Sequence, residues 1–138
     1  LIPLILDAID GKRDQITIFG TDYETPDGTC IRDYVHVCDL ADAHLLGLKW
    51  LENGGSNKVF NLGTGTGFSV REVIEHAGVV TNRHVPFTAG DRREGDCTKL
   101  VSGSELARSE LGWKPERSSL KHMITDAWRW HQKVGYQK

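Results

Sequence analysis

The sequence has few of the residues that bind metals or form disulfides. Its three cysteines are scattered and form no Cys-x-x-Cys pair, and its six histidines show no regular ligand spacing. A zinc site needs closely spaced thiolate and imidazole ligands, and an odd number of scattered cysteines does not indicate a disulfide framework. The sequence therefore predicts no metal site, and unpaired cysteines are typical of a reducing, cytoplasmic setting.

Long apolar runs and an excess of one charge are also missing. No stretch approaches the roughly 20 apolar residues of a membrane span, and the chain has no signal peptide of basic, apolar and small-residue zones. The formal net charge is -2, with 26% charged residues. Because binding to nucleic acid or to a membrane surface needs a basic excess, neither is expected as a partner.

Methionine is almost absent, since Met123 is the only one, and the chain opens at Leu1 within the apolar run 1–6. Translation begins at methionine, so we expect Leu1 to be a cut end. The 138 residues would then be a portion of a longer protein. A chain of this length still buries roughly two thirds of its unfolded surface when it is compact, so it is long enough to form a core.

Apolar periodicity and turn-forming residues predict an alternation of helices and strands. Helices are expected at residues 1–10, at 39–51 with Asp39 as the N-cap, from Ser69, after Ser102, and from 118 or 119 onward. Strands are expected at 16–19, 32–37, 58–62 and 84–88. This alternation predicts the α/β class. Apolar positions cover most of the circumference of the 39–51 helix, so it is expected to need neighbours on more than one side.

A glycine-rich stretch, 63–67, stands where a dinucleotide-binding loop would stand, between an expected strand and an expected helix. The GxGxxG fingerprint requires a third glycine so that helix and strand pack closely, and Phe68 occupies that position. An acidic ribose ligand is expected about 20 residues further on, where the run 85–87 contains no acid. We therefore interpret the stretch as a tight turn that leads into a capped helix.

The densest charge cluster is the segment 92–96, with the sequence RREGD. One interpretation is a solvated loop whose local ion pairs contribute little to stability. The other is a diphosphate clamp, because arginine holds phosphate with a fork of donors and a nearby carboxylate accepts sugar hydroxyls. Arg32 is a second arginine that would strengthen the clamp if it converged with Arg93. Sequence spacing does not show whether the two converge.

Several segments follow one another in a characteristic order. They are 17–20 (TIFG), 22–29 (DYETPDGT), 32–37 (RDYVHV), 39–44 (DLADAH), 60–63 (FNLG), 92–96 (RREGD), 110–113 (ELGW) and 126–131 (DAWRWH). Together they resemble the bacterial UDP-glucose 4-epimerases of the extended short-chain dehydrogenase/reductase superfamily, over nearly the whole chain. The run from Asp22 to Val37 is the most specific to 4-epimerases, whereas NLG and LGW are shared with other sugar-nucleotide enzymes.

The resemblance implies that residues 1–138 are the C-terminal, UDP-sugar-binding portion of a Rossmann-type epimerase, with the Rossmann domain itself largely absent. In the family, the N-terminal half binds NAD, which takes the C4 hydride of the sugar, and the tyrosine of a Tyr-x-x-x-Lys pair takes the 4-hydroxyl proton. None of Tyr23, Tyr34 and Tyr136 has a lysine four positions on. No catalytic residue is therefore predicted. The isolated chain is expected to be inactive, and the full-length enzyme to be a homodimer.

The resemblance also implies which residues bind the UDP-sugar substrate. The backbone and aromatic ring of segment 17–19 would hold uracil, two arginines would meet the diphosphate, and a carboxylate would accept the ribose hydroxyls. The expected substrate-binding residues are Thr17, Ile18, Phe19, Arg32, Arg93 and Asp96. The chain departs from the family pattern at Leu100, where some members have tyrosine, and at Asp91, where proline is frequent.

Two alternatives to a 4-epimerase stay open. The first is another NDP-sugar epimerase, a dehydratase or a decarboxylase of the same superfamily, because most residues that select the sugar lie outside this chain. The second is a stand-alone, non-catalytic nucleotide-binding or interaction module. A genuine start codon at this boundary would favour the module.

Overall fold

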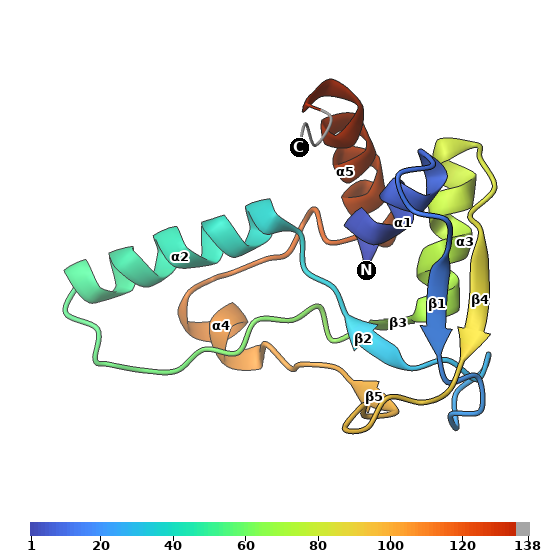
Figure 1. The fold of residues 1–138 in the computed structure, drawn as a ribbon. Helices are drawn as coiled ribbons and strands as arrows, with labels where there is room; N and C mark the ends of the chain where they lie inside the picture. Colours follow the sequence, from blue (N-terminus) through green and yellow to red (C-terminus); the bar gives the residue numbers. More distant parts are fainter. Residues whose placement is uncertain (135–138) are drawn as a thin grey trace.

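A computed structural model describes residues 1–134 of the chain (Figure 1). In chain order the elements are α1 (Ile2–Ile9), β1 (Ile16–Phe19), β2 (Ile31–Asp33), α2 (Val37–Glu52), β3 (Gly67–Ser69), α3 (Val70–Thr81), β4 (Phe87–Gly90), β5 (Lys99–Leu100), α4 (Glu105–Glu110) and α5 (Leu120–Val134). Helices and short strands are interspersed along the chain, which confirms the predicted α/β class. No helix in the described part of the chain is long and apolar enough to cross a membrane.

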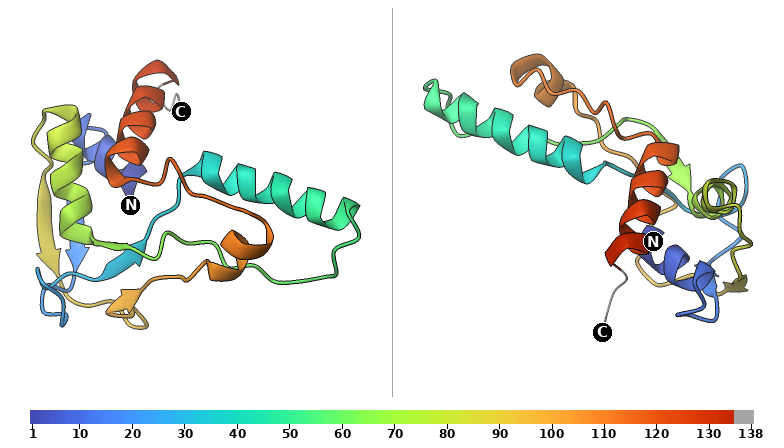
Figure 2. Two further views of the ribbon diagram at one scale, coloured as in Figure 1. Left: turned by 180° about the vertical axis from the view of Figure 1, so that it is seen from behind. Right: turned by 90° about the horizontal axis from the view of Figure 1, so that it is seen from above.

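The strands form two small sheets. In the first, β1 and β4 run parallel, with Ile16 opposite Phe87 and Phe19 opposite Gly90. In the second, β2 lies between antiparallel β3 and parallel β5. The main core lies between the first sheet and the helices α1, α3 and α5, which gather at one end of the molecule (Figure 2). Its fully buried side chains include Ile5, Ile18, Val73 and Ile124.

Helix α3 begins at the predicted capping box. The Ser69 hydroxyl accepts a hydrogen bond from the Glu72 amide at 3.0 Å, and the Glu72 carboxylate accepts one from the Ser69 amide at 2.7 Å. Ser69 also donates to the Asp27 carboxylate, which ties the helix to the loop before β2. Because two of the free amides of the first turn are satisfied locally, this helix start depends little on the rest of the fold.

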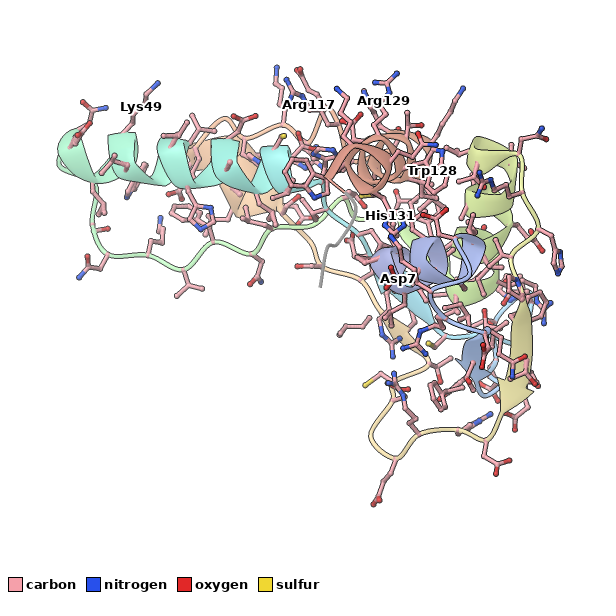
Figure 3. The ribbon with its side chains drawn as sticks, turned by 45° about the horizontal axis from the view of Figure 1, so that its top comes forward. Asp7, Lys49, Arg117, Trp128, Arg129 and His131 are labelled. Carbon is pink, nitrogen blue, oxygen red and sulfur yellow. The ribbon has the colours of Figure 1, made fainter. Side chains whose placement is uncertain are left out.

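Helix α1 is fixed to α5 and α3 through its last residue. Asp10, the C-cap of α1, accepts a hydrogen bond from Nε2 of the buried His131 on α5 at 2.8 Å and pairs with Arg83 at 3.2 Å. Trp128 stacks on His131 with a centroid separation of 5.8 Å, and the Arg83 guanidinium lies over the Trp128 ring (Figure 3). These contacts set the position of α1, which forms one wall of the cleft described below.

Helix α2 begins two residues before the predicted N-cap. His36 is the N-cap, and its Nδ1 accepts a hydrogen bond from the Cys38 amide at 3.0 Å. Asp39 instead lies inside the first turn, where it is buried and accepts hydrogen bonds from the Arg117 amide at 3.0 Å and from the Ser118 hydroxyl. The prediction of Asp39 as N-cap is wrong because a tertiary partner, and not the helix end, satisfies this carboxylate.

Several strand boundaries also differ from the prediction. Of the strand expected at 32–37, only the first two residues belong to a strand, β2. The strand expected at 84–88 begins three residues later, as β4. Residues 58–62 form no strand, because Phe60 and Leu62 pack against the buried Trp113 instead of joining a ladder. The short strands β3 and β5 were not predicted. Helix α4 starts after Ser104 without a side-chain cap, so the capping box expected at Ser102 is wrong.

Helix α2 projects away from the main core, as Figures 1 and 2 show. Only Asp39 and Ala43 of this helix are buried. Leu45, Leu48 and Leu51 are 58%, 54% and 53% exposed. The sequence-based expectation that this helix needs neighbours on more than one side agrees with these unburied apolar positions.

We predict that this 138-residue chain in isolation self-associates through α2, because contiguous exposed apolar side chains favour association. Replacing Leu45, Leu48 and Leu51 together by glutamine is expected to reduce the associated fraction in sedimentation velocity. Val79→Gln is the matched control, since Val79 is a single, 81% exposed apolar residue on α3. A wild-type chain that sediments as a monodisperse monomer would contradict the prediction.

Candidate functional site

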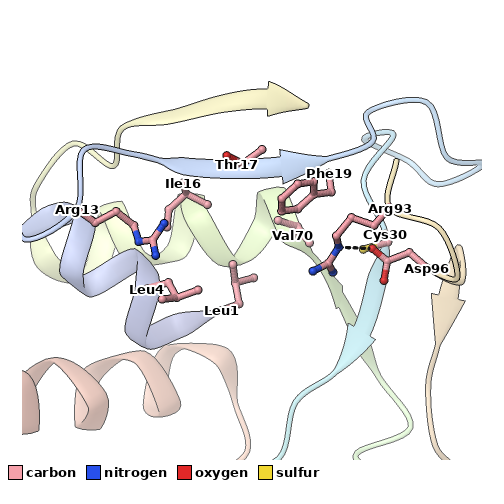
Figure 4. A pocket seen from close by; sticks show the side chains of 10 residues that line it. All are labelled: Leu1, Leu4, Arg13, Ile16, Thr17, Phe19, Cys30, Val70, Arg93 and Asp96. Atoms are coloured by element: carbon pink, nitrogen blue, oxygen red, sulfur yellow. Dashed lines mark hydrogen bonds and ion pairs between the residues drawn. The ribbon is translucent and has the colours of Figure 1, made fainter. Parts of the chain in front are cut away.

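A cleft lies between strand β1 and the start of helix α1 (Figure 4). It encloses about 250 Å³, and its walls are Leu1, Leu4, Arg13, Ile16, Thr17, Phe19, Cys30, Val70, Arg93 and Asp96. Apolar side chains of α1 and β1 form the middle of the cleft, and the ion pair of Arg93 with Asp96 lies at one end (Figure 4). The cleft thus combines an apolar surface with a charged end.

Strand β1 presents a free backbone edge to this cleft. The amides of Ile16 and Gly20 donate to the carbonyls of Pro86 and Gly90, each at 2.9 Å. The backbone N–H and C=O groups of the even-numbered residues of β1 therefore point toward β4. Successive residues of a strand direct their N–H and C=O groups to opposite sides. The backbone groups of Thr17 and Phe19 therefore point to the other edge, where no strand of the described residues pairs with β1.

Ile18 is placed differently from its two neighbours. Its side chain is only 1% exposed and belongs to the main core, and its backbone groups lie on the β4 side of the strand. Of the expected segment 17–19, the structure brings Thr17 and Phe19 to the cleft and leaves Ile18 behind it. Thr17 and Phe19 share one side of the strand, whereas Ile16, on the same side as Ile18, reaches the cleft at the first residue of β1.

The charged end of the cleft is organised around one carboxylate. Asp96 accepts hydrogen bonds from Nε of Arg93 at 2.9 Å and from Arg32 at 3.3 Å. The Arg93 hydrogen bond is the main reason that the pKa of Asp96 lies below its usual value, and the charge of Arg32 adds to the effect. The Arg93 guanidinium also lies 4.7 Å from the centre of the Phe19 ring. The two expected arginines and the expected acid are therefore brought together.

Arg32 differs from Arg93 in how many of its donors are already used. It lies on β2 and is not among the residues that line the cleft, and its Nη1 donates to the Cys97 carbonyl at 2.7 Å and the Ile31 carbonyl at 2.8 Å. Arg93 is 60% exposed in its side chain and lines the cleft directly. Arg93 therefore has more free donors for a bound anion than Arg32 has.

Arg92 has partners outside the cleft. Its Nε donates to Asp22 at 2.7 Å, and its guanidinium lies 4.3 Å from the centre of the Tyr23 ring. Adjacent arginines in the charge cluster thus point in different directions, which sequence spacing does not reveal. Leu100, where the family pattern has tyrosine in some members, is exposed on β5 and pairs in register with Arg32.

The glycine-rich stretch is closed by a carboxylate of the protein itself. The amides of Thr64 and Gly65 each donate to Asp33 at 3.1 Å, and the Thr64 hydroxyl donates to it at 2.6 Å. Asp33 also accepts from the Ser102 amide at 3.3 Å. The amides of Thr64 and Gly65, which would cradle phosphate in a dinucleotide loop, are thus already bonded, and the stretch ends in β3 before the capped helix.

The described tyrosines do not behave as catalytic bases. Burial raises the pKa of Tyr34 to about 12, so its hydroxyl stays protonated at neutral pH, and a general base needs a pKa near the working pH. Tyr23 is buried beneath Arg92. The third tyrosine, Tyr136, lies outside the described residues. Within those residues no three His, Cys, Asp or Glu side chains are grouped so that they could hold a metal ion.

Sequence reasoning missed six of the ten residues that line the cleft. The residues that it did not single out are Leu1, Leu4, Arg13, Ile16, Cys30 and Val70. Most are apolar and follow ordinary core periodicity, so nothing in their spacing separates a cleft wall from a core. Arg13 is different, because a lone arginine just before a strand that carries expected binding residues is a visible feature.

Comparison with known proteins identifies relatives of this chain. Residues 1–63 match the model of the NAD dependent epimerase/dehydratase family. The UDP-glucose 4-epimerase of Streptococcus mutans serotype c is 50% identical over 131 residues, which are 95% of this chain and 39% of that protein. A crystal structure of a UDP-glucose 4-epimerase has a TM-score of 0.94 and 51% identity, and covers 100% of this chain and 43% of that one.

A further solved structure was determined with ligands. The UDP-glucose 4-epimerase from Stenotrophomonas maltophila, with bound NAD and formylated UDP-arabinopyranose, has a TM-score of 0.92 and 42% identity over 96% of this chain and 39% of that one. The first part of this chain is thus similar to the NAD dependent epimerase/dehydratase family. Over nearly its whole length the chain is similar to UDP-glucose 4-epimerases. It spans about two fifths of the length of the curated relatives it matches.

We predict that the two adjacent arginines control the pKa values of two different carboxylates. Arg93→Ala should raise the pKa of Asp96 toward its ordinary value of about 3.9 and leave Asp22 unchanged, because Arg93 bonds Asp96 alone. Arg92→Ala is the matched control and should raise the pKa of Asp22 only. Carboxyl-carbon NMR titration measures both values.

The sign of the pH effect follows from the lowered pKa of Asp96. A carboxylate with a lowered folded-state pKa contributes stability above its unfolded pKa of about 3.9, and this contribution is lost as the pH falls through the lowered value. The Arg93–Asp96 contact should therefore persist at neutral pH and open in acid. An Arg92→Ala variant that shifted Asp96 as strongly as Arg93→Ala would contradict the assignment.

Proposed function

We propose that this chain is the UDP-sugar-binding, C-terminal part of an NAD-dependent UDP-glucose 4-epimerase. The complete enzyme would interconvert UDP-glucose and UDP-galactose by oxidation and reduction at C4 of the sugar, as a step of galactose metabolism. The observation that carries the proposal is the cleft that joins the free edge of β1 to the Arg93–Asp96 pair. The relatives named above support the assignment to this reaction.

The free edge of β1 suits a pyrimidine base. Uracil presents an N–H donor flanked by carbonyl acceptors, and the outward N–H and C=O groups of Thr17 and Phe19 are complementary to such an edge. The Phe19 ring is 40% exposed and offers an apolar face for stacking. Backbone groups of a strand hold a fixed geometry, so they select the base with little loss of conformational freedom.

The charged end suits a diphosphate and its ribose. Arginine has five donors in a planar fork, and Arg93 uses only its Nε on Asp96, so its remaining donors are free for phosphate oxygens. Arg32, held against the same carboxylate, adds positive charge. Asp96 would accept hydrogen bonds from the ribose hydroxyls, as the family resemblance implies. These charge-assisted hydrogen bonds are the strongest polar contacts that the cleft offers.

The size of the cleft fits a partial site. Sites for complete small ligands commonly enclose about 300–1,000 Å³, and this cleft has about 250 Å³. The nucleotide would fill it, and the hexose would extend toward the remainder of the enzyme. Binding energy from the nucleotide then holds the sugar near the reacting groups, although the nucleotide itself does not react.

The described residues do not fit NAD. The glycine-rich turn, the one part of the chain that resembles a dinucleotide loop, has Phe68 in place of the third glycine and has its amides bonded to Asp33. We therefore assign NAD and the catalytic residues to the N-terminal half of the complete enzyme. The isolated chain is then expected to show no epimerase turnover. A cytoplasmic homodimer, which the resemblance implies, is part of the same proposal.

The clamp can be tested in the complete enzyme with Arg32→Ala and Arg93→Ala. A hydrogen bond to a charged group is worth about 1.5–3 kcal/mol, so each change should weaken UDP-sugar binding roughly 10- to 150-fold. Isothermal titration calorimetry with UDP-glucose measures the loss, and thermal melting checks that the fold is kept. Arg92→Ala is the matched control, because Arg92 pairs with Asp22 outside the cleft. An equal loss of UDP-glucose affinity for Arg92→Ala and Arg93→Ala would contradict the assignment of the clamp to Arg93.

A further inference from the structure

We propose that Arg13 reads the base of the bound nucleotide and makes the cleft select uracil over cytosine. The inference rests on the proposed function, since it concerns the same UDP-sugar cleft. Arg13 lies between α1 and β1, is exposed, and lines the cleft. No family motif noted in the sequence includes it.

The Arg13 guanidinium is unused within the protein. It makes no hydrogen bond, ion pair or cation–π contact with any side chain or carbonyl of residues 1–134, whereas Arg93, the other arginine of the cleft, is bonded to Asp96. Lys12, its neighbour in sequence, pairs with Asp10 at 3.8 Å. An arginine held at a cleft wall with all five donors free is available to a ligand with acceptor oxygens.

Arg13 and Arg93 lie at opposite ends of the cleft. Figure 4 shows the Arg13 guanidinium turned toward the cleft near Ile16, at the start of β1, and the Arg93 guanidinium beside Phe19, at the end of β1. The four residues of β1 span roughly 10 Å at about 3.3 Å per residue. Because Arg93, Arg32 and Asp96 take the diphosphate and ribose end, the end at Arg13 is left for the far edge of the base.

The surroundings of Arg13 favour a base over a second phosphate. Leu1, Leu4 and Ile16 line the cleft beside it, and such apolar walls accept the faces of a flat ring but penalise the burial of a diphosphate. The part of a pyrimidine most distant from its ribose bond is the group at C4. In uracil that group is a carbonyl, which accepts hydrogen bonds, and in cytosine it is an amine, which donates them.

Discrimination follows from this difference. The Arg13 guanidinium donates to the C4 carbonyl of uracil, whereas the C4 amine of cytosine would face a donor with no acceptor between them. A site built to hydrogen-bond one group rejects an analogue that lacks it, because polar atoms are left unpaired. The free backbone edge of Thr17 and Phe19 holds the ring, and Arg13 completes its recognition.

The test uses the complete enzyme, with UDP and CDP as probes in isothermal titration calorimetry. Arg13→Met removes the donors at nearly constant volume, and should weaken UDP binding about 10-fold or more while leaving the intrinsic CDP affinity little changed. Arg13→Lys restores a donor and should recover part of the UDP preference. Lys12→Met removes the same unit charge one residue away, so it calibrates the general electrostatic effect on an anionic ligand.

Arg93→Ala serves as the second reference. It should weaken the binding of UDP and of CDP by the same factor, because both nucleotides carry the diphosphate. If Arg13→Met also weakens UDP and CDP equally, or changes neither more than Lys12→Met does, Arg13 does not read the base and the inference is overturned. If the wild-type enzyme binds neither nucleotide, the proposed function itself fails. A UDP-to-CDP preference that collapses in Arg13→Met alone supports the inference.

Discussion

The one-sided pairing of strand β1 is the constraint on which the site depends. Its parallel ladder to β4 uses the backbone groups of Ile16 and Ile18 and leaves those of Thr17 and Phe19 on an open edge. The same ladder ends at Gly90, directly before the segment 91–96. Because β4 runs parallel to β1, its carboxyl end delivers this charged segment beside Phe19. One pairing therefore creates both the free backbone edge and the position of the charged end.

Acidic side chains then fix the loops around that pairing. Asp96 holds Arg93 and Arg32 together, Asp33 closes the glycine-rich turn, and Asp39 anchors the segment before α5 to the first turn of α2. Each of these carboxylates accepts at least one hydrogen bond from a segment distant in sequence. Buried or half-buried carboxylates need such partners, because an unpaired charge removed from water is costly. The loops are therefore positioned by polar contacts as much as by apolar packing.

The exposed apolar face of α2 and the small volume of the cleft have a common explanation. A chain that spans about two fifths of its relatives' length contains the core of α1, α3, α5 and β1, which is satisfied internally. Helix α2 lies apart from that core with most of its leucines exposed. The cleft is likewise incomplete, because its volume is smaller than that of a site for a complete ligand. Both features are in keeping with the proposal that the chain is part of a longer protein.

The sequence by itself determined the elements whose causes are local. The first helix, the strand 16–19 and the capping box of Ser69 all depend on near neighbours, and the structure has them where the pattern predicts them. For the RREGD segment the sequence left a solvated loop and a diphosphate clamp open, and the structure brings Arg93 and Asp96 of this segment to the cleft. Only the tertiary structure decided which arginine of that segment faces the cleft, that Ile18 lies behind it, and that Asp39 is no cap. Those outcomes depend on partners such as Asp22, β4 and Ser118, which lie tens of residues away and leave no trace in local spacing.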